Sequence, residues 1–311
     1  MNRTPKYVIY LVIFLSIWNF NHANMIKHGI KNVVDVSSSS QGTYFLNNFG
    51  IVYVQSKGTY MPLDLPDKII QIQAVRDSIF MLREDGSVWR FHAKGLHLLD
   101  GDLPNQQILA SDDKLYMLKR SGGLSVFENN ALRSLVYDRN FEVMVMKGSN
   151  SMFLLDSWGR LFHYDTYAER SELADPSRNT IQLVSGDGIL YMLKKDGQVF
   201  KYEDLEFHSL DFDVSVETMA AEGDFLFFID KKKGLFEYNR MIDRLTQIDM
   251  SGKPSMLRVT NGKLYVVDEK GDVFEYVIPS KKKEIQAQFN QMWNSSDMYP
   301  QNSGFVDSSA R

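Results

Sequence analysis

The 311-residue sequence contains no cysteine. This absence excludes disulfide bonds, thiolate metal ligands, a cysteine nucleophile and a lipid-bearing cysteine. The sequence also lacks an excess of basic residues, because 35 Lys and Arg stand against 39 Asp and Glu and give a formal net charge of -4. Proteins that hold a nucleic-acid backbone use such an excess to displace counterions. We therefore expect no nucleic-acid partner.

Familiar catalytic and cofactor motifs are missing as well. The chain has no G-x-S-x-G, P-loop or HExxH pattern, each of which would place a nucleophile, a phosphate or a zinc ion. Its six histidines include no pair at the spacing of metal ligands on a helix. We predict no cofactor, no metal ion and no catalytic residue. The composition, 44% hydrophobic and 24% charged, is that of an ordinary folded protein.

Residues 1–23 combine a short basic start with an apolar run. Arg3 and Lys6 precede the stretch YVIYLVIFLSIW, residues 7–18, in which Ser16 is the one polar residue. As a helix this run would be about 18 Å long, short of the roughly 30 Å hydrocarbon core of a bilayer. The pattern predicts a signal peptide cleaved after Ala23, and hence a secreted or periplasmic protein. An uncleaved membrane anchor is the alternative interpretation.

A thirteen-residue pattern recurs seven times at intervals of 36 to 38 residues. Its clearest copies are LYMLKKDGQVFKY (190–202) and LYVVDEKGDVFEY (264–276), and the copies begin at residues 43, 79, 115, 152, 190, 226 and 264. The second position is always aromatic, and the fourth and tenth are always aliphatic. The eighth is glycine in six copies, while the remaining copy has Lys233 beside Gly234. A period of this length is typical of solenoids and propellers.

Each copy predicts a β-hairpin. Its first four residues are nearly all apolar, which favours a strand that is covered on both faces. A polar turn ending in glycine follows, and glycine supplies the positive φ of a tight turn. An apolar stretch before most hairpins and a more polar stretch after them complete four short antiparallel strands per unit. Between Val33 and Tyr276 no long amphipathic helix is indicated, so the predicted fold class is all-β.

Seven four-stranded units of about 37 residues predict a seven-bladed β-propeller over residues 24–285. Each unit needs a neighbour on both faces, and a closed ring gives every unit two neighbours. The seventh unit lacks a good fourth strand after Tyr276. Residues 284–289 or residues 24–30 could complete it, and the sequence leaves both possibilities open. An open β-solenoid and a pair of packed β-sandwiches are the alternative architectures. Residues 286–311 are rich in Asn, Gln and Ser, and we predict a disordered tail there.

The blade core resembles the repeats of the chromosome-condensation-regulator and quinoprotein propeller families. Their hallmark is a strand, a charged pair, a glycine and an aromatic-bearing strand, as in FMLREDGSVWRF at residues 80–91. The resemblance covers roughly residues 31–277 and is specific for the fold. A quinoprotein dehydrogenase would imply vicinal cysteines, regular tryptophan motifs and calcium ligands, whereas this chain has no cysteine and four tryptophans. The nuclear exchange function of the chromosome-condensation regulators is not expected here, because the predicted signal peptide would direct this chain to another compartment.

The hairpin turns are the most informative features outside the predicted core. They repeat on a common face and carry mixed charges, so seven of them would form a crown around the ring. Two also carry an aromatic residue that could anchor a partner. The predicted partner-binding residues of these turns are Phe49, Arg83, Lys119, Arg120, Trp158, Lys194, Lys195, Lys231 and Lys232.

A well-formed repeat core without a catalytic constellation favours a binding function. We expect an exported, non-enzymatic and monomeric propeller that presents its turns to a protein partner or ligand. One alternative is a hydrolase or lyase whose polar residues meet at the central channel. The other alternative is a carbohydrate-binding lectin with one site between each pair of blades, and this would require the same turn residues in every copy.

Overall fold

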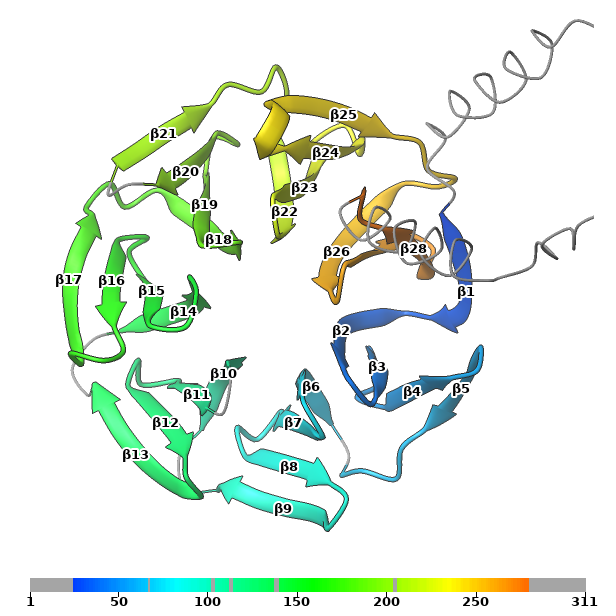
Figure 1. The fold of residues 1–311 in the computed structure, drawn as a ribbon, viewed down its shortest axis with the longest axis vertical. Coiled ribbons are helices and arrows are strands. Elements are labelled where there is room, and N and C mark those ends of the chain that lie inside the picture. The colour runs from blue at the N-terminus through cyan, green and yellow to red at the C-terminus, as the bar shows by residue number, and fades with distance from the viewer. Residues whose placement is uncertain are drawn as a thin grey trace, which may run out of the picture.

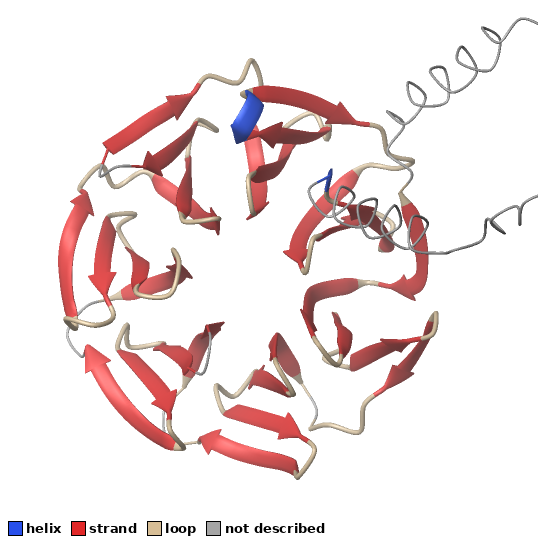
Figure 2. Cartoon of the chain, viewed as in Figure 1, coloured by secondary structure: helices blue, strands red, loops and turns tan. Residues whose placement is uncertain are grey.

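The computed structural model describes residues 25–279, except residue 67 and residues 102–103, 112–113, 137–139 and 204–205. Its 28 strands form seven four-stranded antiparallel sheets. The sheets stand around a central axis like the blades of a propeller (Figure 1). Strands make up nearly all of the regular structure in this part of the chain (Figure 2). The predicted all-β seven-bladed propeller is therefore confirmed.

Each blade consists of four strands, which follow one another from the central channel outward. Blades 1 and 2 are β2 (Val33–Ser39), β3 (Gly42–Asn47), β4 (Val52–Ser56) and β5 (Thr59–Pro62), then β6 (Ile69–Val75), β7 (Ser78–Arg83), β8 (Val88–His92) and β9 (Gly95–Asp100). Blades 3 and 4 are β10 (Asn105–Ser111), β11 (Lys114–Lys119), β12 (Leu124–Glu128) and β13 (Ala131–Val136), then β14 (Phe141–Met146), β15 (Ser151–Asp156), β16 (Leu161–Asp165) and β17 (Arg170–Asp175). Blades 5 and 6 are β18 (Thr180–Gly186), β19 (Ile189–Lys194), β20 (Val199–Glu203) and β21 (Glu206–Leu210), then β22 (Val216–Glu222), β23 (Phe225–Asp230), β24 (Leu235–Asn239) and β25 (Arg244–Ile248), with the short 3-10 helix η2 (Arg240–Ile242) before β25. Blade 7 is β26 (Pro254–Thr260), β27 (Lys263–Asp268), β28 (Asp272–Val277) and β1 (Ile26–Lys31).

The first strand of the chain closes the ring. Strand β1 pairs antiparallel with β28, so blade 7 combines both ends of the described chain. Lys27 and Asp272, which are 245 residues apart, are joined by an ion pair of 2.6 Å. Of the two closures that the sequence left open, the structure shows the N-terminal one. Residues 284–289 and the predicted tail at 286–311 lie outside the described residues, as do residues 1–24.

The core lies between neighbouring blades. In one cluster Phe153 and Leu161 of blade 4 pack with Leu183 and Met192 of blade 5. The second strand of each blade supplies most of the fully buried side chains, as its apolar sequence predicted; in β19, for example, all six residues are buried. Burial on both faces means that no blade forms its core alone, and this ties the stability of the sheets to the ring.

The turn between the second and third strands requires a left-handed residue. The six glycines at the eighth repeat position have φ values from 78° to 91°. In blade 6 Lys233 itself takes this conformation, with φ 67°, whereas Gly234 does not have a positive φ. An ion pair of 2.8 Å between Lys233 and Glu217 holds the strained position.

A β-bulge recurs near the start of every innermost strand. In each blade the pairing between the first and second strands skips one residue, for example between Ile69 and Gln71. The seven skipped residues are Val34, Ile70, Gln106, Glu142, Ile181, Glu217 and Ser255. A bulge re-aims the side chain of the extra residue. Ile70 and Ile181 are consequently exposed although they belong to the innermost strands.

Candidate functional site

One face of the ring carries all seven turns that join a second strand to a third, and we call it the turn face. In each blade the residue directly after the second strand donates its backbone N–H to the carbonyl of the residue directly before the innermost strand of the same blade, at 2.8 to 3.0 Å. The donors are Asn48, Glu84, Arg120, Ser157, Lys195, Lys231 and Glu269. The turn glycines also abut the next blade, since a Cβ on Gly50 would lie 2.9 Å from Lys68 Cα. The turns therefore form a fixed platform.

Most of the predicted binding residues lie exposed on this face. Phe49, Arg120, Trp158, Lys195, Lys231 and Lys232 are exposed in their turns. Arg83 is half-buried and pairs with Asp85 at 3.1 Å. The Arg120 guanidinium donates to the carbonyl of Glu84 at 2.8 Å, so it also bridges blades 2 and 3.

The expectation that Lys119 and Lys194 lie exposed in the turns is wrong. Both are buried, and each ammonium group pairs with an aspartate at the end of the preceding blade's outermost strand. Lys119 contacts Asp100, and Lys194 lies 2.5 Å from Asp175. A buried lysine needs such a partner, because the charge has lost its hydration. These two residues join neighbouring blades and are not available at the surface.

Trp158 is an exposed aromatic residue of the turn face that has two arginine side chains beside it. Its side chain is 56% exposed, and two guanidinium groups stack near its ring. The Arg160 guanidinium lies 4.3 Å from the ring centroid and that of Arg178 lies 5.7 Å from it. The Arg160 side chain is itself held by Asp156, because Arg160 Nε donates to the Asp156 carboxylate at 2.6 Å. Cation–π contacts of this kind hold the indole in place while it stays accessible.

A second aromatic residue occupies the equivalent turn of blade 1. Phe49 is 72% exposed, and its backbone N–H is fixed by the Asn47 side chain at 3.0 Å. Each of these two aromatic turns packs against the next blade. Gly50 of the Phe49 turn lies against Lys68, and Gly159 of the Trp158 turn lies against Arg178. Ile70 and Ile181, the exposed bulge residues of those next blades, come two residues after Lys68 and three residues after Arg178 in the sequence. The turn face thus carries two exposed aromatic residues, Phe49 and Trp158, each next to a junction between blades.

The sequence pattern did not reveal the isoleucines or the two arginines around Trp158. Ile70 and Ile181 lie in apolar stretches that predict buried strands, and the bulge that exposes them to solvent has no single-residue signature. Arg160 and Arg178 come from different blades, and only the fold brings them to one ring. The aromatic residues themselves were visible as bulky side chains within polar turns.

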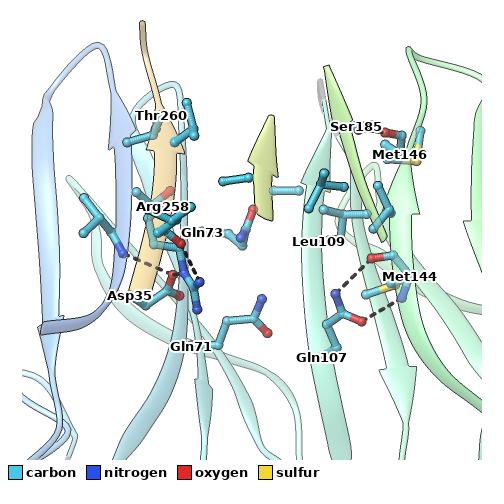
Figure 3. Close-up of a pocket in the computed structure, with 18 of the residues that line it drawn as sticks. Asp35, Gln71, Gln73, Gln107, Leu109, Met144, Met146, Ser185, Arg258 and Thr260 are labelled. Carbon is cyan, nitrogen blue, oxygen red and sulfur yellow. Dashed lines mark hydrogen bonds and ion pairs between the residues drawn. The ribbon is translucent and has the colours of Figure 1, made fainter. Parts of the chain in front are cut away.

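The central channel, with a volume of about 710 Å³, is lined by the innermost strands. Three glutamines at the same strand position, Gln71, Gln107 and Gln182, bridge neighbouring blades. Each donates its side-chain amide to the carbonyl of a residue 37 positions later and accepts that residue's N–H, at 2.8 to 3.0 Å. Figure 3 shows the pair of bonds between Gln107 and Met144. These amides satisfy backbone groups of strands that are not paired with each other.

Asp35 takes the glutamine position in blade 1 and binds an arginine. Its Oδ2 accepts from the N–H of Ile72. Its Oδ1 accepts from Arg258 Nε at 3.0 Å, and both of these residues are labelled in Figure 3. Burial raises the pKa of Asp35, against the opposing charge of Arg258. Among the described residues that line the channel, these two are the only charged groups and none is a histidine. Both Asp35 oxygens are thus engaged in joining blades.

Metal-ligand clusters and membrane-crossing helices do not occur within the described residues. No three of their His, Asp or Glu side chains are grouped to hold a metal ion, and no helix among them has the length and apolar character needed to cross a bilayer. The turn tips differ from blade to blade, as Phe49, Asp85, Ser121, Trp158, Asp196, Lys232 and Lys270 hold the same turn position. A lectin with one identical site per blade would need a common residue there.

Comparison with known proteins identifies the fold and no family. No protein-family model and no curated protein matches the sequence. Among solved structures, YCF48 bound to D1 peptide superposes with a TM-score of 0.65 and 11% identity, over 82% of this chain and 96% of the other. The structure of Kap60 bound to yeast RCC1 (Prp20) gives a TM-score of 0.60 and 11% identity, over 84% and 83% of the two chains.

A bacterial surface protein shows a similarity of smaller extent. PorZ of Porphyromonas gingivalis, a component of the type-IX secretion system, gives a TM-score of 0.53 and 13% identity, over 68% of this chain and 33% of PorZ. Identities this low carry the shared architecture and nothing about a partner. On the evidence of its seven closed blades and these similarities, the chain is a β-propeller repeat protein.

Proposed function

We propose that this protein is an exported, non-enzymatic propeller that binds another protein through its turn face. The observation that carries the proposal is Trp158, which is exposed and has the guanidinium groups of both Arg160 and Arg178 near its ring. Tryptophan and arginine are enriched among the residues that dominate binding energy at protein interfaces. An indole that is already fixed loses little conformational freedom when a partner covers it.

The rest of the turn face suits the same role. Phe49 is a second exposed aromatic residue, and the exposed cations Arg120, Lys195 and Lys231 lie in other turns of the same face. Apolar anchors surrounded by polar residues are the usual anatomy of an interface. Two similar propellers have structures with bound partners, as the names YCF48 bound to D1 peptide and Kap60 bound to yeast RCC1 state. This supports a binding role without naming the partner.

The test is affinity capture with the chain from Asn24 onward, followed by measurement of the affinity for the captured protein. We expect Trp158→Ala to weaken binding by about thirtyfold or more, the scale of an interface hot spot. Phe49→Ala should weaken it to a smaller extent, because no cation of the described part of the chain stacks on the Phe49 ring.

Tyr167 provides the matched control. It is an aromatic residue of the same blade, is 90% exposed, and lies in the β16–β17 turn on the face opposite the turn face. Tyr167→Ala should leave the affinity unchanged. Equal losses for Trp158→Ala and Tyr167→Ala, or no loss for either, would contradict the turn face as the binding platform.

Export through residues 1–23 is part of the proposal. Cleavage after Ala23 would leave two residues before the closing strand β1, which begins at Ile26, so the cut would spare the strand that completes the ring. The similarity to PorZ, a bacterial surface component, is compatible with this location. Mass spectrometry of the protein from a secreting host should show Asn24 as the first residue. An intact Met1 would favour the membrane anchor instead.

A further inference from the structure

A groove opens between blades 2 and 3 on the face opposite the turn face, and we call it the edge groove. It consists of an inner cavity of about 200 Å³ and an outer cavity of about 440 Å³, which share Arg90, Phe127 and Asn130 as lining residues. The inner cavity begins at the β6–β7 turn with Arg76 and Asp77. The outer cavity extends to the outermost strands β9 and β13.

Cations predominate among the residues that line the edge groove. Arg76, Arg90, Lys94 and Lys114 line it, whereas Asp77 is the one acidic residue among the described residues that do so. The Lys114 ammonium group is paired with Glu128 at 3.0 Å, so Arg90 and Lys94 are the cations that a ligand would meet. In the whole chain acidic residues outnumber basic ones, 39 to 35. A local excess of positive charge in an acidic protein favours an anionic ligand.

Arg90 is placed to bind such a ligand. Its Nε donates to Ser78 Oγ at 3.0 Å, and Ser78 Oγ donates to Asp77 at 3.0 Å. The guanidinium carbon lies 5.7 Å from the centre of the Phe80 ring. These contacts fix the plane of the guanidinium, while its two terminal nitrogens have no hydrogen-bond or ion-pair partner among the described residues. A fixed guanidinium with both terminal nitrogens available matches the geometry of a carboxylate.

Two histidines add donors at the outer cavity. The rings of His92 and His97 stack with their centroids 4.9 Å apart. His92 Nδ1 accepts the N–H of Lys94 at 3.0 Å, which places the proton of the neutral ring on Nε2. Partial desolvation and the neighbouring charges of Arg90 and His97 hold the pKa of His92 below its usual value. At neutral pH the ring is therefore a neutral donor that faces the groove.

Apolar side chains border the same cavity. Leu98 of β9 is 51% exposed and Leu132 of β13 is 43% exposed, and both line the outer cavity with Phe127. A free inorganic anion would have no use for these leucines. A nucleic acid would need many more cations than this groove supplies. A lipid surface contacts protruding groups more readily than a recess between two blades.

We propose that the edge groove binds an extended peptide segment of another protein in which acidic and apolar side chains alternate. Carboxylates of the segment contact Arg90, Lys94 and His92, and its apolar side chains cover Leu98 and Leu132. Alternate side chains of an extended peptide point to opposite sides, so the segment reaches the cationic wall and the apolar border together. This site is separate from the turn face and does not depend on the function proposed for Trp158.

The test is fluorescence anisotropy of the full propeller, from Asn24 onward, with two short labelled peptides. One peptide alternates Glu with Leu, and the other alternates Lys with Leu. We expect the acidic peptide to bind and the basic one not to bind, and we expect added salt to weaken the binding. Equal binding of both peptides, or no binding of the acidic one, would overturn the proposal.

Charge reversal at one exposed lysine locates the site. Lys94→Glu should weaken binding of the acidic peptide by at least about tenfold, the scale of a lost charge contact at an interface. Lys57→Glu is the matched control, because Lys57 is an exposed lysine in the β4–β5 turn of blade 1, which corresponds to the turn of Lys94 in blade 2. Equal effects of the two reversals would show a nonspecific response to net charge and would refute the site.

Two further measurements distinguish a peptide site in this groove from the turn face and from a site for lipids or free anions. Arg90→Gln, which keeps a donor near Ser78, should also weaken the acidic peptide, whereas Trp158→Ala should not. Anionic lipid vesicles or inorganic phosphate that displace the peptide at concentrations where added chloride does not would show a different ligand class and overturn the peptide assignment. If Lys94→Glu loses the acidic peptide but still binds the captured protein through the turn face, the two sites are independent.

Discussion

In six of the seven blades the fifth position of the repeat stabilises its turn in one of two ways, and in blade 2 it is Arg83, which pairs with Asp85. In four blades it is Asn or Asp, and the side chain accepts two backbone N–H groups of its own turn at 2.7 to 3.0 Å. These residues are Asn47, Asp156, Asp230 and Asp268. In blades 3 and 5 it is Lys119 or Lys194, which reaches an aspartate 19 residues earlier in the preceding blade. The first arrangement fixes a turn within one blade, and the second joins two blades.

The difference teaches that the fold requires a fixed turn and tolerates either chemistry for fixing it. Accepting two N–H groups satisfies the turn locally, without any help from a neighbour. A buried ion pair brings a desolvation cost and depends on a partner in another blade. Removing one group should therefore have unequal effects at the two kinds of turn.

The largest effect is expected at the lysines. Lys194→Ala leaves the Asp175 charge buried without its cation, and we expect the free energy of unfolding to fall by about 3–5 kcal/mol. The control is Lys195→Ala, since Lys195 is exposed and its loss should change stability by less than about 0.5 kcal/mol. Urea unfolding measures both. Equal values for the two variants would mean that the buried pair does not stabilise the ring.

A smaller effect is expected where the turn is fixed within one blade. Asp230→Ala removes the acceptor of the Lys232 and Gly234 N–H groups, and we expect a loss of about 1–2 kcal/mol in the same titration. Asp230→Asn should be close to the parent protein, because Asn47 performs this role in blade 1. A loss for Asn as large as that for Ala would show that the charge and not the acceptor matters.

The smallest effect concerns pH. Burial raises the pKa of Asp175, but hydrogen bonds from Lys194 and Ser177 outweigh it and leave the pKa below 3.8. A carboxylate with a lowered pKa stabilises the fold above its unfolded pKa, and this contribution disappears as the pH falls through the folded value. Lys194→Met removes the cation, so only the Ser177 hydrogen bonds still oppose burial, the pKa of Asp175 rises and its stabilising contribution decreases.

The stability difference between the parent and Lys194→Met should therefore grow as the pH rises from about 3 to about 6. Urea unfolding at several pH values measures it, and the other carboxylates contribute equally to both proteins. A difference that does not change with pH would show that Asp175 does not titrate as a partner of Lys194.

The sequence was sufficient for the architecture because each essential position occurs seven times. The aromatic second position and the aliphatic fourth and tenth positions all lie where a strand is covered on both faces, as in β19. The turn glycines take the left-handed conformation that the pattern predicts, and blade 6 shows that Lys233 can take it too. Closure by β1 was one of two possibilities, since residues 24–30 and 284–289 both suit a strand.

The candidate site could be predicted only where a residue acts within its own blade. Phe49 and Trp158 stand out in polar turns, but the burial of Lys119 and Lys194 depends on aspartates of other blades. The 19-residue spacing does not reveal it: Arg83 follows Asp64 at the same interval, yet Arg83 pairs with Asp85 and Asp64 is exposed. Contacts across blades follow from the curvature of the ring, which a local pattern does not encode.

Closure by β1 also sets the order in which the protein can mature. The ribosome makes this strand first and its partner β28 last among the described strands, and Lys27 and Asp272 are 245 positions apart. A nascent chain therefore holds an unpaired edge strand through almost the whole of its synthesis. The ring can be completed only after the seventh blade has emerged, so a chain that stops before β28 leaves β1 without its partner and the seventh blade unfinished.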